Sequence, residues 1–347
     1  MKHFSYPDIK QFRSAIHNIT HVTRFIGTTT AGDAIYDETI PLPKVSYRGT
    51  IKLHGTNAGV AKNLITGELS VQSRENIITP QKDNAGFARF VENADFNSVF
   101  DMIPSLICAP DINNQEESDA VIIYGEWCGR GIQKNVAISN LDKMFVIFSI
   151  KYAGNWLSDE IVRKVSNPAK RIFNILDFPV HDIVIDFSNP EIASQELQAK
   201  CIEVEKECPV GKAFGASGIG EGLVYKPLEA KYSDSKFWFK VKGEKHSVVK
   251  TKTLAPVDVE KASSINEFVD KVVVENRLNQ GIEVIKRTSG VNYISNEHIG
   301  PFIKWIIADI AKEESDTLAI SGLTIKDVSG EISKKAKEFL FKNFLNK

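Results

Sequence analysis

The sequence contains little that would mark a secreted, membrane-bound or thiolate-metal protein. Its four cysteines form no CxxC pair; they are Cys108, Cys128, Cys201 and Cys208. A disulfide framework or a cysteine metal site is therefore not expected, and a reducing cytosol is the default compartment. No apolar run approaches the roughly 20 residues that a membrane span requires, and no long apolar run follows the basic residue at the N-terminus. We expect a cytoplasmic protein without a membrane partner.

Net charge and the common phosphate-loop motifs are also lacking. The 43 basic and 44 acidic residues give a formal net charge of -1, so any contact with nucleic acid must come from a local basic patch. There is no GxxxxGKS/T loop, no GxGxxG after a strand and no HExxH run, which excludes the chemistry that these devices carry. The hydrophobic fraction of 42% and the charged fraction of 25% are ordinary for a globular protein.

The 347 residues are enough for two domains. Alternating and β-branched patterns predict strands over 45–53, 58–63, 69–73, 120–127, 144–152, 223–225 and 236–242. Helical spacing is predicted over 84–107 and 191–207, and again from residue 264 onward. We therefore predict an α+β chain. Antiparallel sheets with flanking helices would fill 1–250, followed by a linker over 251–261 and a small all-α domain over 262–347.

The run KLHGTN at residues 52–57 stands at the end of the first predicted strand, where Gly55 breaks the pattern. Lys52 would then lie beside a tight turn, partly sheltered from water. An amine nucleophile must be neutral, and a free lysine, with a pKa near ~10.4, needs help from burial, nearby cations or a metal ion. A KxxG pattern alone also fits a surface lysine before a loop, so other parts of the chain must decide.

Five further stretches follow in a fixed order and supply what a nucleophilic lysine needs. They are Ser73-Arg74-Glu75, Tyr124-Gly125-Glu126, Phe145-Val146-Ile147-Phe148, Glu221-Gly222-Leu223-Val224-Tyr225-Lys226 and Lys240-Val241-Lys242. Lysines on one strand face could lower the pKa of Lys52 and stabilise charge on a phosphate. Carboxylates at strand ends suit Mg²⁺. The alternatives are a solvated face for the lysines and a salt bridge at a strand end for each glutamate.

Together these stretches resemble the covalent nucleotidyltransferase superfamily of polynucleotide ligases and mRNA capping enzymes, and most closely the phage RNA ligase 2 family. Two longer runs carry the closer resemblance, KLHGTN at 52–57 and GIQKNV at 131–136. The resemblance covers residues 47–245 by motif. Ile51 departs from it, because an acidic residue is expected before the lysine.

The resemblance implies a nucleotidyltransferase fold for the first domain and a role for each motif. Lys52 would be the nucleophile, and Lys240 and Lys242 would act with it on the α-phosphate. Glu221 would bind the metal ion, and Glu126 would bind the metal ion or the ribose. Nucleotide contacts are implied for Ile51, Lys52, Leu53, His54, Asn57, Arg74, Glu126, Phe148, Glu221, Lys240 and Lys242, and nucleic-acid contacts for His54, Asn57, Gln133, Lys134 and Lys226.

The sequence therefore predicts an ATP-dependent RNA ligase that works through a lysyl-AMP intermediate with Mg²⁺, or Mn²⁺ in its place. Its partner would be RNA with 3′-hydroxyl and 5′-phosphate ends, expected as a duplex with a nick, and the protein would be a monomer of a kind that suits a phage. The alternatives are a DNA ligase, a capping guanylyltransferase, or a relative that binds nucleic acid without catalysis. The intact set of lysines and glutamates argues against the last of these.

Overall fold

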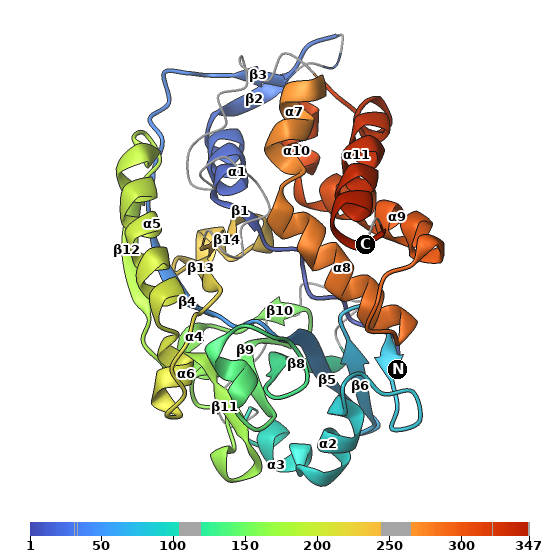
Figure 1. The fold of residues 1–347 in the computed structure, drawn as a ribbon. Helices are drawn as coiled ribbons and strands as arrows, with labels where there is room; N and C mark the ends of the chain where they lie inside the picture. Colours follow the sequence, from blue (N-terminus) through green and yellow to red (C-terminus); the bar gives the residue numbers. More distant parts are fainter. Residues whose placement is uncertain (31, 33, 104–118, 244–264, 321, 346–347) are drawn as a thin grey trace. The chain divides into compact units, whose positions relative to one another are not determined.

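The computed structural model describes the chain apart from residues 31, 33, 104–118, 244–264, 321 and 346–347 (Figure 1). Its contacts separate two compact units. The first unit is formed by Met1–Ile9, Lys44–Ile185 and Ala199–Lys240, and the second by Lys10–Pro43, Asp186–Gln198 and Val241–Lys347. The predicted linker over 251–261 lies outside the described residues.

One sheet of the first unit runs in the order β14-β13-β4-β12. These strands are β14 (Phe239–Lys242), β13 (Gly222–Pro227), β4 (Lys44–Lys52) and β12 (His181–Asp186). In β4, burial alternates from residue to residue, as a strand with one face in the core requires. β13 pairs antiparallel with β4 and places Gly222 opposite Lys52.

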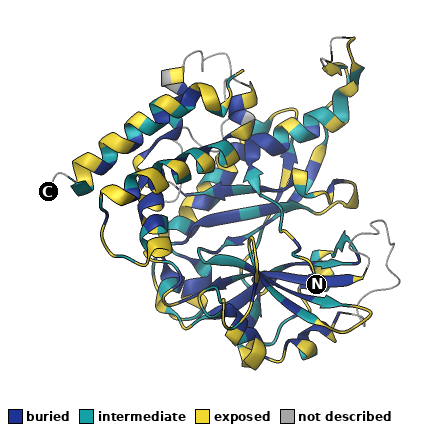
Figure 2. Ribbon diagram, turned by 90° about the vertical axis from the view of Figure 1, so that its right-hand side faces the viewer, coloured by how far each residue is buried: buried dark blue, intermediate teal, exposed yellow. Residues whose placement is uncertain are grey.

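The second sheet of this unit runs in the order β10-β9-β8-β5-β6-β7, with β11 beside β9. The strands are β5 (Thr56–Asn63), β6 (Leu69–Ser73), β7 (Ile77–Ile78), β8 (Ala120–Cys128), β9 (Met144–Tyr152), β10 (Asn155–Trp156) and β11 (Ile172–Asn174). All of these neighbours pair antiparallel except β11, which runs parallel to β9. Nearly every residue of β8 and most of β9 are buried, so these strands form the centre of the core (Figure 2).

Two short helices pack against the second sheet. α2 (Phe87–Asn93) and α3 (Phe96–Phe100) each bring one aromatic ring onto Phe145 of β9, with ring centroids 5.0 Å away for Phe87 and 5.8 Å away for Phe96. The other helices that include first-unit residues are α4 (Asp159–Val162), α5 (Pro190–Lys206) and α6 (Pro209–Ala213).

The second unit is mainly helical. It contains β1 (Lys10–Gln11), α1 (Phe12–Arg24), the hairpin of β2 (Phe25–Thr28) with β3 (Ala34–Tyr36), and α7 (Ile265–Val272), α8 (Glu275–Ser289), α9 (Ile299–Glu313), α10 (Ser315–Ile320) and α11 (Ile325–Leu340), which a π-helical turn (Phe341–Leu345) follows. Apolar residues at helical spacing form its core, among them Phe302, Ile306 and Ile310 of α9 and Ile332 of α11. No helix among the described residues is long and apolar enough to cross a membrane.

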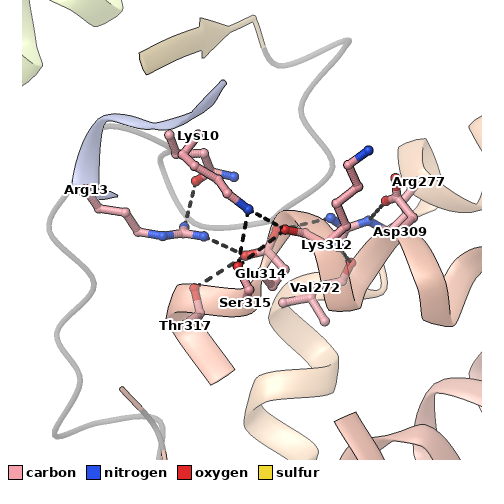
Figure 3. Close-up of polar contacts among 10 residues, drawn as sticks. Lys10, Arg13, Val272, Arg277, Asp309, Lys312, Glu314, Ser315 and Thr317 are labelled. Carbon is pink, nitrogen blue, oxygen red and sulfur yellow. Dashed lines mark hydrogen bonds and ion pairs between the residues drawn. The ribbon is translucent and has the colours of Figure 1, made fainter. Parts of the chain in front are cut away.

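A buried carboxylate joins the N-terminal part of the second unit to its C-terminal helices (Figure 3). Glu314 is 1% exposed; its Oε2 lies 2.8 Å from Nη2 of Arg13, and its Oε1 lies 3.0 Å from Nη2 of Arg277. Arg277 also donates to Asp309 and to the carbonyl of Val272. Because buried charges are costly unless paired, this network fixes the start of α1 against helices that are about 300 residues away in sequence.

A second contact strengthens the same junction. Lys10 donates through Nζ to the carbonyl oxygen of Lys312, at 2.8 Å, and to Oγ of Ser315, at 3.3 Å (Figure 3). Residues 10–43 therefore belong to the same compact unit as the C-terminal helices. The predicted domains of 1–250 and 262–347 stay a prediction, and this grouping must be considered in any test of them.

The predicted α+β class, with antiparallel sheets and a helical C-terminal region, is confirmed. The helical run predicted over 84–107 is two short helices in its described part, because Asp95 adopts a left-handed φ of 49° between them. The strand predicted over 236–242 is shorter than expected. Its beginning is a 3₁₀ turn, Ser235–Phe237, and only Phe239–Lys242 is extended.

The Glu314 network gives a stability prediction. Glu314→Gln should lower the free energy of unfolding by about 3–5 kcal/mol, because it removes the buried carboxylate that faces two buried guanidinium groups, of which Arg277 keeps its pair with Asp309. Chemical denaturation measures this change. Glu331→Gln is the matched control. Glu331 forms an exposed ion pair with Lys334, so this substitution should cost less than about 1 kcal/mol. Equal, small effects of the two substitutions would show that the network contributes little.

Candidate active site

The KLHGTN run is the connection between the two sheets of the first unit. β4 ends at Lys52 in one sheet, and β5 begins at Thr56 in the other. Only Leu53, His54 and Gly55 lie between them. Lys52 therefore stands at the point where the chain passes from one sheet to the next, with a sheet on either side to supply partners.

Gly55 fits tightly against β8. A Cβ atom on this residue would lie 2.4 Å from the carbonyl oxygen of Trp127 and 2.8 Å from Cβ of Cys128, closer than such atoms can approach. The Gly55 amide donates to Oε1 of Glu126 at 2.9 Å, and its carbonyl accepts from Nε2 of Gln133 at 3.1 Å. The glycine of the motif is thus needed for close packing, and it brings Glu126 and Gln133 to the turn.

Lys52 pairs with the buried carboxylate of Glu221. Nζ of Lys52 lies 2.8 Å from Oε2 of Glu221, and Nδ1 of His54 lies 3.3 Å from the same oxygen. Glu221 is 4% exposed and comes just before β13, whose Gly222 lies opposite Lys52. Lys52 itself is 24% exposed, so a ligand can reach its amine. The structure brings together Lys52, His54 and Glu221, as the sequence predicted for a common site.

Glu126 approaches the same lysine from the second sheet. It lies in β8 opposite Asn57 of β5. Burial raises the pKa of Glu126 to about 7, against the opposing effect of the Lys52 charge, and the nearby negative charge of Glu221 raises the pKa further. The charges of Lys52 and Glu221 therefore both act on Glu126, although Glu126 and Glu221 belong to different parts of the first unit.

The carboxylates of Glu126 and Glu221 are the groups that could hold a metal ion here. No group of three or more His, Cys, Asp or Glu side chains within the described residues is arranged to hold a metal ion. Two carboxylates nevertheless fit Mg²⁺, which is commonly bound by one or two protein carboxylates, with substrate phosphates and water completing its shell. The donor set is thus compatible with a metal ion that arrives with a nucleotide.

Phe148 and Arg74 are both in contact with the N-terminal segment. Phe148 lies in β9, and its ring centroid is 4.9 Å from that of Tyr6. Arg74 follows β6 and forms an ion pair with Asp8. Sequence reasoning missed both Tyr6 and Asp8. No local pattern marks them, because their partners lie 66 or more residues further along the chain.

Lys226 extends from β13 toward the second sheet rather than into solvent. Its Nζ donates to the carbonyl of Phe148 at 2.8 Å and to Oγ of Ser149, and it lies 4.6 Å from the ring centroid of Trp238. Burial lowers the pKa of Lys226 to about 8, against the opposing charge of Asp159. Its contacts support the backbone around Phe148, and a role in contacting nucleic acid stays a prediction.

The remaining predicted residues lie in four settings. Ile51 and Leu53 are buried in the core at 4% and 5% exposure, so any nucleotide contact would come from their backbone. Lys240 lies on β14 beside β13. Lys242, at the end of β14, belongs to the second unit, where its charge acts on Asp309 of α9. Lys134 is exposed.

Comparison with known proteins gives a family match. The RNA ligase family model matches residues 46–242. The Naegleria gruberi RNA ligase with PPi is similar at 18% identity and a TM-score of 0.41, over 69% of this chain and 56% of that chain. Two variants of that ligase with ATP and Mn give 17% and 18% identity and TM-scores of 0.42 and 0.43, over 69% and 70% of this chain and 56% of each of theirs. No curated protein matches significantly.

The matched range begins within β4 and ends at the last residue of β14, so it includes Lys52, both glutamates and the two β14 lysines. Because the family model covers more than half of the 347 residues, the chain belongs to the RNA ligase family. The chain spans a little over half of the length of the Naegleria structures.

The burial of Lys226 predicts how stability depends on pH. Its pKa of about 8 in the folded protein lies below that of an unfolded lysine, near ~10.4. The contribution of Lys226 to the free energy of unfolding is therefore fully present above pH ~10.4, where the lysine is neutral in both states. This contribution is lost as the pH falls through about 8. Relative to Lys226→Met, the wild-type protein should lose about 2 kcal/mol between pH 10 and pH 8.

Denaturant unfolding of both proteins at the two pH values measures this difference. Lys231→Met is the control, because Lys231 is exposed in the same part of the chain. A pH dependence that is the same for wild type and Lys226→Met would contradict the depressed pKa.

Proposed function

We propose that the chain is an ATP-dependent RNA ligase that joins a 3′-hydroxyl to a 5′-phosphate through a lysyl-AMP intermediate. The observation that carries the proposal is the position of Lys52. Its amine lies at the passage between two sheets, 2.8 Å from Glu221 and close enough to Glu126 to affect its pKa. Membership of the RNA ligase family supports the reading, because the matched range contains all of these groups.

In the first step, Nζ of Lys52 attacks the α-phosphorus of ATP. A phosphorus–nitrogen bond forms, the bond to the β-phosphate oxygen breaks, and pyrophosphate leaves. An ammonium that donates to Glu221 has no lone pair, so the observed Lys52–Glu221 pair represents the resting enzyme. Lys52 must lose a proton and turn from Glu221 to the phosphate before it attacks. Lys240 and Lys242 would stabilise the charge that builds on the phosphate oxygens.

In the second and third steps, AMP activates the broken strand. An oxygen of the RNA 5′-phosphate attacks the lysyl-AMP phosphorus, and the amine of Lys52 leaves. The 3′-hydroxyl then attacks the activated 5′-phosphate, AMP leaves, and a phosphodiester bond forms. His54 lies in the turn, Asn57 lies just after it, and Gln133 and Lys134 lie in the segment that follows β8. These four residues are the proposed contacts to this strand. Gln133 already donates to the turn at Gly55, so it also holds the loop.

Glu126 and Glu221 would hold the divalent metal ion together with the phosphates of ATP. When bound, this ion neutralises charge on the phosphates and helps to orient them. Phe148 is the proposed stacking partner of adenine, and Arg74 the proposed partner of ribose or phosphate. The Naegleria ligase variants hold ATP and Mn, the same classes of cofactor.

The preferred nucleic acid within this scheme is a nick in duplex RNA or in an RNA–DNA hybrid. The alternative is a DNA ligase or another nucleotidyltransferase of the superfamily. Sealing assays on nicks with RNA or DNA on each side, together with labelling by ATP or GTP, distinguish these activities. Sealing that requires a DNA 3′-hydroxyl would favour a DNA ligase, and labelling by GTP alone would favour a capping enzyme. The proposed action in the cytoplasm, as a monomer, follows from the same reading.

The nucleophile can be tested directly. Lys52→Ala should abolish transfer of label from α-labelled ATP to the protein, while circular dichroism shows that the variant is folded. Some loss of thermal stability is expected, because the substitution removes a partner of the buried Glu221 carboxylate. The control is Lys236→Ala, because Lys236 is an exposed lysine of the same basic segment. A Lys52→Ala protein that still becomes covalently labelled would remove the basis of the proposal.

Lys240 and Lys242, the proposed contacts to the α-phosphate, make a separate prediction. Lys240→Ala and Lys242→Ala should each slow self-adenylylation by at least about 10²-fold, as expected when one preorganised donor to a developing charge is lost. Rates of lysyl-AMP formation at saturating ATP give the measurement. The same loss in Lys236→Ala would instead favour a diffuse electrostatic effect of this basic segment.

A further inference from the structure

The N-terminal segment offers the candidate nucleotide site the same two kinds of group that a nucleotide offers. Tyr6 presents an aromatic ring to Phe148, at 4.9 Å and an interplanar angle of 58°. Asp8, two residues later, presents an anion to Arg74. Phe148 and Arg74 are the residues proposed to receive adenine and a nucleotide oxygen. A ring and an anion of the N-terminal segment thus contact the two residues that are proposed to receive a base and a nucleotide oxygen.

The segment is anchored on one side of these contacts. Phe4 is 5% exposed, its amide donates to Oε1 of Gln72 at 3.0 Å, and its carbonyl accepts from the hydroxyl of Tyr124 at 3.1 Å. Tyr6 is held by its hydroxyl, 3.0 Å from Oγ of Ser149. These buried contacts keep the chain next to Phe148 whether or not Asp8 is engaged.

The Asp8 contact is of a different kind. The side chains of Asp8 and Arg74 are 36% and 42% exposed, and ion pairs of this exposure contribute little stability. A guanidinium fork suits a carboxylate and a phosphate equally well. The nucleotide can therefore replace Asp8 at Arg74 at small cost, without disturbing the anchored residues.

We propose that Asp8 competes with ATP for Arg74, and that its carboxylate occupies the Arg74 guanidinium until a phosphate oxygen of ATP replaces it. This inference rests on the proposed function, because it takes Arg74 as a contact to ATP. Asp8 acts through Arg74 and does not touch the reacting atoms. It keeps the guanidinium extended toward the N-terminal segment, and it competes with the ligand for the same donors.

The test measures ATP binding and self-adenylylation separately, in the full-length protein. Asp8→Asn should tighten binding of ATP by about 2–5-fold, the range expected for loss of an exposed competing ion pair. The maximal rate of lysyl-AMP formation should stay unchanged. Tripolyphosphate should become a better competitor by the same factor, whereas adenosine, which lacks the anion, should not. Asp8→Glu, which keeps the charge, should behave as the wild type.

Two controls isolate the Arg74 contact. Asp101→Asn removes another exposed carboxylate of the first unit, paired with Lys62 at 3.7 Å, and should leave ATP binding unchanged. In an Arg74→Ala background, Asp8→Asn should lose its effect. Weaker binding of ATP to Asp8→Asn, or no change, would overturn the inference while labelling of Lys52 upheld the proposed function. Absence of ATP binding to the wild type would overturn both.

Discussion

Between Lys52 and Thr56 the backbone leaves one sheet and enters another, and the register of each sheet fixes what this passage meets. On one side, Gly222 lies opposite Lys52, which places Glu221 beside the amine. On the other side, Asn57 lies opposite Glu126, which receives the Gly55 amide. A shift of either register by one residue would turn a carboxylate to the opposite face and separate it from the lysine. The charge arrangement at Lys52 therefore depends on backbone pairing in two sheets.

Much of this arrangement could be predicted from the sequence because it follows short-range patterns. The alternation in 45–53 and the apolar runs at 120–127 and 144–152 indicated β4, β8 and β9 nearly to the residue. The motif order also indicated which groups would meet at the turn. The sequence could not show that Lys226 would be buried against the Phe148 carbonyl, because a lysine after a strand fits a solvated face equally well. That outcome depends on the packing of one sheet against the other.

Contacts between distant parts of the chain were the hardest to predict. Asp8 and Arg74 are 66 residues apart, and Arg13 and Glu314 are 301 residues apart. No periodic pattern connects such positions, and a lone aspartate or arginine near the N-terminus reads as solvated surface. The prediction of one continuous helix over 84–107 was wrong for a local reason instead. Its apolar spacing is continuous through the described part, but the left-handed backbone at Asp95 divides it, and periodicity does not report a single dihedral angle.

The pairing of Arg13 with Glu314 also has a consequence for synthesis on the ribosome. Residues 10–43 are synthesised before the C-terminal helices of the second unit, by 301 residues for this pair. At elongation rates of about 5–20 residues per second, the delay is roughly 15–60 s. During that time the Glu314 carboxylate has not yet been made, so the network cannot hold the start of α1. The position of α1 within the second unit is therefore completed only after synthesis has passed Glu314.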